Sequence, residues 1–214
     1  RTDAYSHCLD AQHGLDIDSV IRSPDGNAID GVRYERGKPY NQPINTSLAH
    51  DSTFLESDFG LEPEIIGRSF DDRTWLLRVI RPDRPVEYWL HDHRLKTHFR
   101  VDPVTIENNS EIVPPSAYAT LATKDGFEIP YYLAAPKKRV CDVSQRSCPL
   151  AVLIHGGPTR RDRIAYDADA AWLQSRGFWV VRINYRGSSG YGLRFRRAGD
   201  RQWGAAMIDD VNAV

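Results

Sequence analysis

The loop His155-Gly156-Gly157-Pro158 holds the residue types and spacing that most directly suggest chemistry. It follows the apolar run Leu150–Ile154, and the carboxyl end of a buried strand is where open α/β sheets bind ligands. Two consecutive glycines let the backbone approach a substrate closely and aim N–H groups at it. Such a donor stabilises the negative charge that develops on a tetrahedral intermediate. A tight Gly-Gly turn that stops at a proline is the structural alternative.

A second loop, residues 184–192, follows another apolar run and is rich in glycine and aromatic residues. We expect it at the same edge of the sheet, with Tyr185 and Arg186 on the substrate side. It lacks the G-x-G-x-x-G spacing of dinucleotide-binding loops and the Gly-Lys-Ser/Thr of P-loops, so no nucleotide is expected there. A flexible turn or an anion-binding nest is the alternative interpretation.

Two further clusters are weighed for ligand binding. His91, His93 and His98 lie near a predicted hairpin, but a metal needs three or four converging ligands with supporting partners. We therefore favour a solvated hairpin and predict no metal and no cofactor. The basic group Arg160-Arg161 with Arg163 is likewise expected to be solvated surface.

The composition argues against several classes of partner. The 214 residues include 28 Lys plus Arg and 29 Asp plus Glu, which gives a formal net charge of −1. This balance provides no general attraction to nucleic acid or to an anionic membrane surface. No apolar run approaches the roughly 20 residues that span a bilayer, and no leader is visible. Neither nucleic acid nor membrane is an expected partner, whereas a homo-oligomer stays open.

The elements that precede these loops predict antiparallel β structure. A turn signal at residues 23–26 separates two strand patterns, and residues 41–60 suit a short helix or a linker. Four short strands then follow within about 40 residues, the size of one propeller blade. They are expected at residues 64–70, 75–80, 86–90 and 97–101. A β-sandwich is the alternative, because it also uses short strands with regular turns.

After a proline-containing linker over residues 102–117, the pattern becomes that of an α/β sheet. A hairpin with an Asp-Gly turn at 125–126 comes first. The continuous apolar runs Leu150–Ile154 and 178–183 are typical of parallel strands buried on both faces. The change of pattern predicts a second structural unit from about residue 116.

Two helices are expected in this second unit. Asp167 is placed to cap a helix between the two apolar runs, with Ala168, Ala171 and Trp172 on one face. A last helix is expected from Trp203 onward, because Trp203, Met207, Val211 and Val214 recur at spacings of four and three. No residue that ends a helix follows, so we expect the chain to be a piece of a longer protein.

The three cysteines are Cys8, Cys141 and Cys148. A disulfide between Cys141 and Cys148 across their short polar loop is one interpretation and would indicate an oxidising compartment. Two free thiols in a cytosolic protein are the other. The compartment is thus left as cytoplasmic or periplasmic, with the periplasm favoured only if the disulfide forms.

Residues 150–214 resemble the start of the catalytic domain of the prolyl oligopeptidase family of serine peptidases. The branch they resemble most is that of acylaminoacyl peptidases and dipeptidyl-aminopeptidase-like enzymes. The motifs stand in the family's order: His155-Gly156-Gly157-Pro158, Tyr166-Asp167, Ser175-Arg176-Gly177-Phe178, Asn184-Tyr185-Arg186-Gly187-Ser188, Gly190-Tyr191-Gly192, Ala198-Gly199, Gln202-Trp203-Gly204 and Asp209-Asp210-Val211. The region before residue 116 resembles the end of the family's β-propeller in a divergent form.

The resemblance implies C-terminal blades of a β-propeller over residues 1–115, followed over 116–214 by the N-terminal part of an α/β-hydrolase fold. It implies a peptidase that hydrolyses short or N-acylated peptides through an acyl-enzyme. The Gly157 N–H becomes the expected oxyanion donor, with His155 and Gly156 shaping the loop. An esterase or lipase on the same fold, and a non-catalytic peptide-binding propeller module, are the alternatives.

The nucleophile of such an enzyme is missing from these residues. A Gly-x-Ser-x-Gly elbow does not occur, and the nearest sequence, residues 187–191, fails because position 191 is Tyr. The triad order in this fold is Ser, then Asp or Glu, then His, and all seven histidines lie upstream of the expected elbow. We expect the whole triad beyond Val214 and expect residues 1–214 alone to be inactive.

Overall fold

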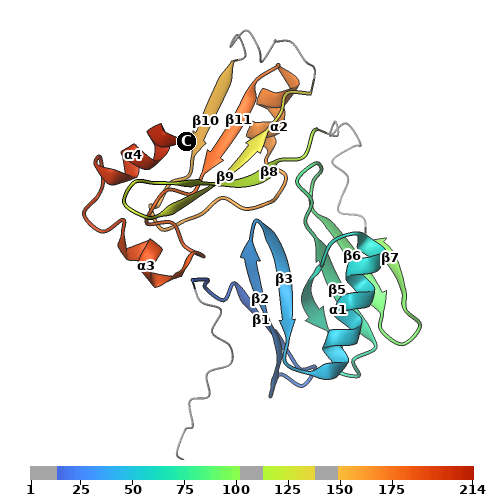
Figure 1. Cartoon of the computed structure of the whole chain (residues 1–214). Helices are drawn as coiled ribbons and strands as arrows, with labels where there is room; N and C mark the ends of the chain where they lie inside the picture. Colours follow the sequence, from blue (N-terminus) through green and yellow to red (C-terminus); the bar gives the residue numbers. More distant parts are fainter. Residues whose placement is uncertain (1–13, 102–112, 138–148) are drawn as a thin grey trace, which may run out of the picture.

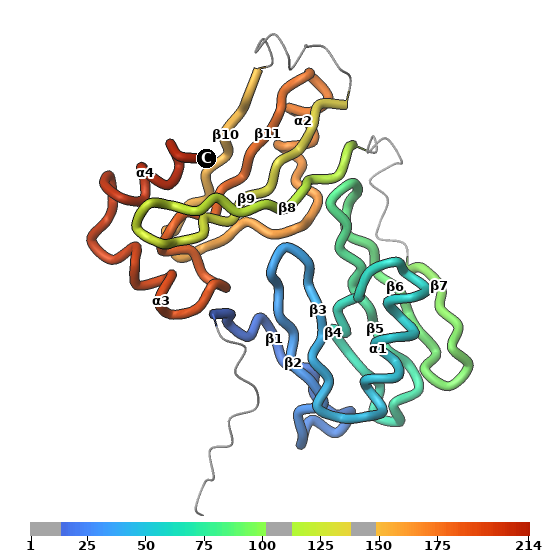
Figure 2. Tube along the Cα trace, in the orientation of Figure 1, coloured from blue at the N-terminus to red at the C-terminus, as the bar shows by residue number. Residues whose placement is uncertain are grey.

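The computed structural model describes residues 14–101, 113–137 and 149–214. This described part contains three β-sheets and four helices (Figure 1, Figure 2). The first two sheets lie together with the first helix, and the third sheet with the other helices forms the remaining part. The three cysteines and most of the predicted linker fall outside the described residues, so the disulfide stays a prediction.

The first sheet is antiparallel, with its strands in chain order: β1 (Ser19–Arg22), β2 (Ile29–Arg36) and β3 (Lys38–Pro43). The predicted turn between β1 and β2 is confirmed, because the Gly26 N–H donates to the Ser23 carbonyl at 2.9 Å. Strand β3 was not expected from the sequence. Gly37, at φ +74°, permits the reversal from β2, and an edge strand tolerates the prolines of β3.

Helix α1 (Thr46–Phe59) confirms the helical alternative for residues 41–60. The Asn45 side chain caps its start by accepting the Ser47 N–H, and Gly60 ends it in the left-handed conformation at φ +69°. The four predicted strands are also confirmed, as one antiparallel sheet in chain order. They are β4 (Glu64–Arg68), β5 (Thr74–Val79), β6 (Glu87–Asp92) and β7 (Thr97–Val101).

Helix α1 packs on this second sheet through Leu48, Leu55 and Phe59, which are almost fully buried. They meet the buried side chains Trp75 and Leu77 of β5. Burial of such side chains contributes about 1.5–3 kcal/mol each. The apolar cluster therefore joins the helix to the sheet as one packed unit.

The third sheet is mixed, in the order β10-β11-β9-β8. The predicted hairpin is confirmed as β8 (Ala117–Ala122) and β9 (Glu128–Ala134), with Gly126 at φ +83° in the turn. Strands β10 (Leu150–Ile154) and β11 (Trp179–Ile183) pair in parallel. Helix α2 (Ala168–Ser175) connects them, and the Asp167 side chain caps it by accepting the Ala170 N–H at 2.8 Å, as predicted.

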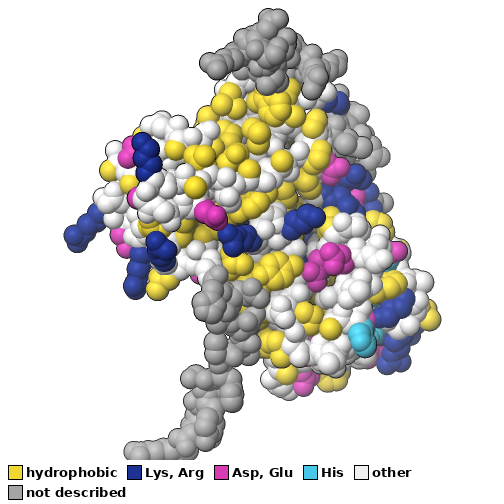
Figure 3. All heavy atoms as spheres, viewed as in Figure 1, with side chains coloured by type: hydrophobic (Ala, Val, Ile, Leu, Met, Phe, Trp, Pro, Cys, Tyr) yellow, Lys and Arg dark blue, Asp and Glu magenta, His cyan; other side chains and the backbone are white. Residues whose placement is uncertain are grey.

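The sequence prediction was wrong about the burial of two parts of this unit. Strand β10 is covered on one face only: Leu150, Val152 and Ile154 are exposed, whereas Ala151 and Leu153 on the other face pack against an apolar cluster. Figure 3 shows hydrophobic side chains gathered where the third sheet lies. On α2 the buried face includes Ala170 and Ala171, whereas Trp172 is exposed beneath the Arg176 guanidinium.

Two short helices complete the unit, α3 (Gly192–Arg197) and α4 (Ala206–Ala213). Met207 is buried and Val211 and Val214 pack against the same apolar cluster, as the spacing predicts. Trp203, however, precedes α4 and is exposed, because the helix begins only at Ala206. Within the described ranges, no helix has the length and apolar character needed to cross a bilayer.

Candidate functional site

The glycine loop follows directly from the end of β10 at Ile154. Gly157 has φ +131°, and a Cβ built on it would lie 2.8 Å from the Arg160 backbone nitrogen. No side chain fits there without moving the backbone. A Cβ on Gly156 would meet open space. The second glycine is thus the one whose conformation the fold demands.

Tyr185 and His155 pack against each other beside this loop. Their rings stack with centroids 4.6 Å apart, and the Tyr185 hydroxyl donates to the His155 carbonyl at 2.8 Å. Burial, with a smaller effect from Asp162, raises the pKa of the Tyr185 hydroxyl. The hydroxyl therefore remains a protonated donor that holds the loop at its first residue.

His155 also contacts a serine, with its Nε2 atom 2.9 Å from the Ser188 Oγ atom. The Ser188 hydroxyl is fully buried and donates to the Tyr185 carbonyl at 2.6 Å. Because a hydroxyl has one proton, the imidazole must donate to this serine. A nucleophilic serine donates to its base instead, so this pair positions the loop and does not form a catalytic dyad.

Arg186, predicted on the substrate side, is buried. Its guanidinium pairs with Asp210 of α4 at 2.7 Å and with Asp125 of the β8–β9 turn at 2.6 Å. The hydrogen bond from Arg186 lowers the pKa of Asp125 to about 2. Two carboxylates thus occupy the side chain, an arrangement that favours a packing role; a role toward substrate stays a prediction.

An apolar cavity of about 320 Å³ lies against the glycine loop. Gly157 and Tyr185 are brought together in its wall, whereas His155, Gly156 and Arg186 are not among its lining residues. The remaining lining comes from the end of β10, the loop and the α4 region: Ile154, Pro158, Trp203, Gly204, Met207, Ile208 and Val211. The sequence analysis did not include residues in or just before α4 in the candidate site. The motif Gln202-Trp203-Gly204 was, however, among those that carry the family resemblance.

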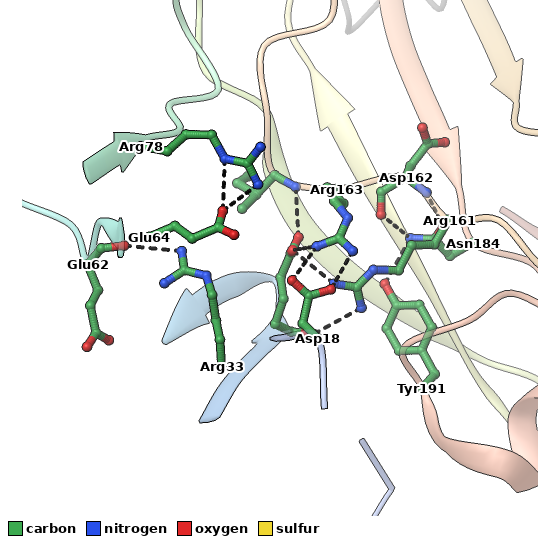
Figure 4. A network of polar contacts seen from close by, with 12 residues as sticks. Asp18, Arg33, Glu62, Glu64, Arg78, Arg161, Asp162, Arg163, Asn184 and Tyr191 are labelled. Atoms are coloured by element: carbon green, nitrogen blue, oxygen red, sulfur yellow. Dashed lines mark hydrogen bonds and ion pairs between the residues drawn. The ribbon is translucent and has the colours of Figure 1, made fainter. Parts of the chain in front are cut away.

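The prediction of solvated arginines after the loop is wrong for Arg161. Its side chain is 5% exposed and its Nη2 atom lies 2.9 Å from the Glu35 Oε2 atom. Arg163 contacts the same oxygen at 2.8 Å and also pairs with Asp18. Figure 4 shows the arginines turned toward Asp18. The two carboxylates lie more than 120 residues earlier in the chain, so a local sequence pattern could not predict these ion pairs.

The prediction of a solvated histidine hairpin is wrong for His91, which is fully buried on β6. The centroid of its ring lies 5.9 Å from that of Phe54 and 5.9 Å from that of Trp75. Burial lowers its pKa to about 4. Among the residues the structure describes, no three His, Cys, Asp or Glu side chains are arranged to hold a metal ion.

The chain is similar to known peptidases along most of its length. Residues 164–214 match the prolyl oligopeptidase family. Dipeptidyl aminopeptidase BIII of Pseudoxanthomonas mexicana is 25% identical over 92% of this chain and 29% of its own length. Dipeptidyl peptidase family member 6 of Caenorhabditis elegans is 29% identical over 91% of this chain and 29% of its own length. The chain therefore spans about 29% of the length of these curated relatives.

A solved structure supports the same fold. The acylaminoacyl peptidase of Pyrococcus horikoshii matches 94% of this chain and 30% of its own, with a TM-score of 0.62 and 16% identity. The sequence motifs, the loop geometry and these matches agree on one assignment. Residues 164–214 match the prolyl oligopeptidase family, and the chain is similar to peptidases over most of its length.

Proposed function

We propose that the chain forms part of a serine peptidase that hydrolyses short or N-acylated peptides through an acyl-enzyme. The observation that carries this proposal is the position of Gly157. It follows the carboxyl end of β10, in a conformation that excludes a side chain, and lines the apolar cavity. An N–H at that point of the fold is half of the oxyanion hole in α/β-hydrolases.

The proposed organisation is a partial β-propeller over residues 1–115 and the start of an α/β-hydrolase domain over 116–214. The antiparallel four-stranded sheet β4-β5-β6-β7 supports the first assignment, because one blade has this form. The parallel pair β10–β11 joined through α2 supports the second. Relatives that are more than three times as long leave room for further blades and for the rest of the hydrolase domain.

In the proposed reaction, a serine attacks the peptide carbonyl and the Gly157 N–H stabilises the oxyanion. His155 and Gly156 shape the loop, and stacking on Tyr185 together with the hydrogen bond to Ser188 fixes the imidazole in place. The serine, the acid and the base of the triad would come from sequence beyond residue 214. Short peptides are the proposed substrates, and the cavity beside Gly157 would take an apolar group.

The test uses the full-length protein that carries this sequence. It should hydrolyse an N-acylated dipeptide p-nitroanilide, and a fluorophosphonate probe should label one serine outside residues 1–214. A Gly157→Ala substitution should lower kcat by about 10²-fold, because the donor moves from the oxyanion. The control Gly60→Ala also places alanine at a positive φ, +69°, but with open space around it. Labelling of Ser188, or an unchanged kcat in Gly157→Ala, would contradict the proposal.

A further inference from the structure

A single carboxylate from the first sheet reaches three points of the segment that follows the glycine loop. Glu35, the second-last residue of β2, is 6% exposed. Its Oε2 atom accepts hydrogen bonds from Arg161 at 2.9 Å and Arg163 at 2.8 Å. Its Oε1 atom accepts the Ile164 N–H at 3.2 Å. Both oxygens are thus used, all on residues 161–164.

The third sheet holds the same segment from its other side. The Asn184 side chain accepts the Asp162 N–H at 2.7 Å and donates to the Asp162 carbonyl at 3.1 Å. Arg182 of β11 donates to the Arg163 carbonyl at 3.2 Å. Figure 4 shows Asn184 and Asp162 facing each other next to the arginines. Residues 161–164 are therefore held by hydrogen bonds from the first sheet on one side and from the third sheet on the other.

The held segment, residues 161–164, begins close to Gly157. Only three residues separate Gly157 from Arg161, and the backbone folds back so tightly that a Cβ on Gly157 would touch the Arg160 nitrogen. The Arg160 carbonyl in turn accepts the Ser189 N–H at 3.4 Å. Gly157, Thr159 and Arg160 are themselves exposed, so a shift of residues 161–164 would reach Gly157 through this short, folded-back stretch of backbone and not through packed side chains.

The charges balance within the cluster of Asp18, Glu35, Arg161 and Arg163. Burial acts to raise the pKa of Asp18, but the hydrogen bond and charge of Arg163 outweigh it, so the pKa is lowered and the carboxylate stays ionised. Arg163 is 44% exposed, whereas Arg161 is 5% exposed and has Asp18 as its other carboxylate, at 3.7 Å. Loss of the Glu35 charge would leave the buried Arg161 poorly compensated and drive it to rearrange.

We propose that Glu35 is a positioning residue that holds the Gly157 N–H in place for the oxyanion. The catalytic consequence rests on the proposed function. The structural part rests on the contacts that hold residues 161–164 between the first and third sheets. Glu35 touches neither substrate nor reacting atoms. It acts from the first sheet, through the segment 161–164, on the alignment of one backbone donor.

The test substitutes Glu35→Gln in the full-length protein, which keeps the shape and the Ile164 contact and removes the charge. We expect kcat to fall by about 10-fold with KM within about twofold, the signature of a lost transition-state interaction. A peptidyl aldehyde, which forms an oxyanion when bound, should bind about 10-fold more weakly, while the matched peptidyl alcohol should not change. A role in folding alone would affect both inhibitors alike.

The matched control is Glu128→Gln. Glu128 also joins the two parts of the molecule by an ion pair, with Arg36 of β2, but both side chains are more than half exposed. It should keep kcat and both inhibitor affinities. If Glu35→Gln does not fold, Arg163→Gln replaces it, because this half-exposed side chain can be removed with less strain; a smaller change in the same direction is expected.

Hydrogen exchange separates this inference from the proposed function. In Glu35→Gln the amides of residues 157–164 should exchange at least about 10-fold faster, with the β8–β9 amides unchanged. If the wild-type protein hydrolyses no peptide, the proposed function fails, and the exchange result alone decides whether Glu35 holds the loop. Unchanged exchange over 157–164, or equal losses for aldehyde and alcohol, would overturn the inference.

Discussion

Two interfaces in this molecule bury polar side chains in opposite ways. Where the first sheet meets the segment 161–164, the buried Glu35 and Arg161 are paired. Where α1 meets the second sheet, His91 is fully buried and both ring nitrogens lack a hydrogen-bond partner among the described residues. Paired charges fix one geometry, since any displacement exposes an uncompensated charge. A neutral imidazole among rings acts as an apolar group until acid protonates it.

The largest expected effect breaks the paired interface. Glu35→Gln should lower the free energy of unfolding by about 3 kcal/mol, because it leaves the buried Arg161 charge without its nearest partner. Urea unfolding of the full-length protein, followed through the transition of the part that contains the third sheet, measures this. A loss below about 0.5 kcal/mol, the value typical of surface substitutions, would mean that the two guanidinia find new partners.

The next largest effect is expected from the uncharged hydrogen bonds that hold the segment 161–164. Asn184→Ala removes the partner of the Asp162 backbone groups and of the Tyr191 hydroxyl. Because buried polar groups are then left unsatisfied, we expect a loss of about 2 kcal/mol in the same unfolding measurement. Asn27→Ala, in the exposed first turn, is the control and should change little. Equal losses in both variants would contradict the prediction.

A third effect concerns the unpaired imidazole and depends on pH. The folded pKa of His91 is lowered to about 4 from 6.5, so between these values the unfolded chain binds more protons than the folded one. Stability contributed at this site therefore rises with pH across that window and is lost as pH falls through it. We expect the wild type to lose about 2 kcal/mol relative to His91→Leu between pH 7 and 5.

Comparison with His91→Leu cancels the titration of the charged groups that face this ring, Asp51, Lys96, His93 and His98. Unfolding curves of the two proteins at both pH values supply the difference. Parallel pH dependence in the two proteins would show that the ring has access to a proton acceptor or to water in the folded state.

The smallest effect is expected at the surface. Glu128→Gln removes an ion pair between the two parts of the molecule whose side chains are both more than half exposed. Solvent screens such a pair, so we expect a change of less than about 0.5 kcal/mol. Salt should abolish even that. A loss as large as that of Glu35→Gln would mean that burial is not what separates the two interfaces.

Local sequence patterns predicted many of the helices and strands. The spacing of short apolar segments predicted all four strands of the second sheet, and Asp167 marked the start of α2. The edge strand β3 escaped prediction because its prolines weaken a strand pattern, although an edge position tolerates them. The exposure of one face of β10 was also not predicted, because a run of apolar residues does not show whether other elements cover both faces of its strand.

The motifs and the glycine loop after an apolar strand could be recognised in the amino-acid sequence, because they depend on residues that are close along the chain. The fold was needed to show that Arg161 is buried against Glu35 and that the Ser188 hydroxyl donates to a backbone carbonyl. It was also needed to show that the buried His91 ring has no hydrogen-bond partner among the described residues. Each of these depends on groups brought together across the fold. Burial and pairing are properties of that meeting, and no spacing along the chain encodes them.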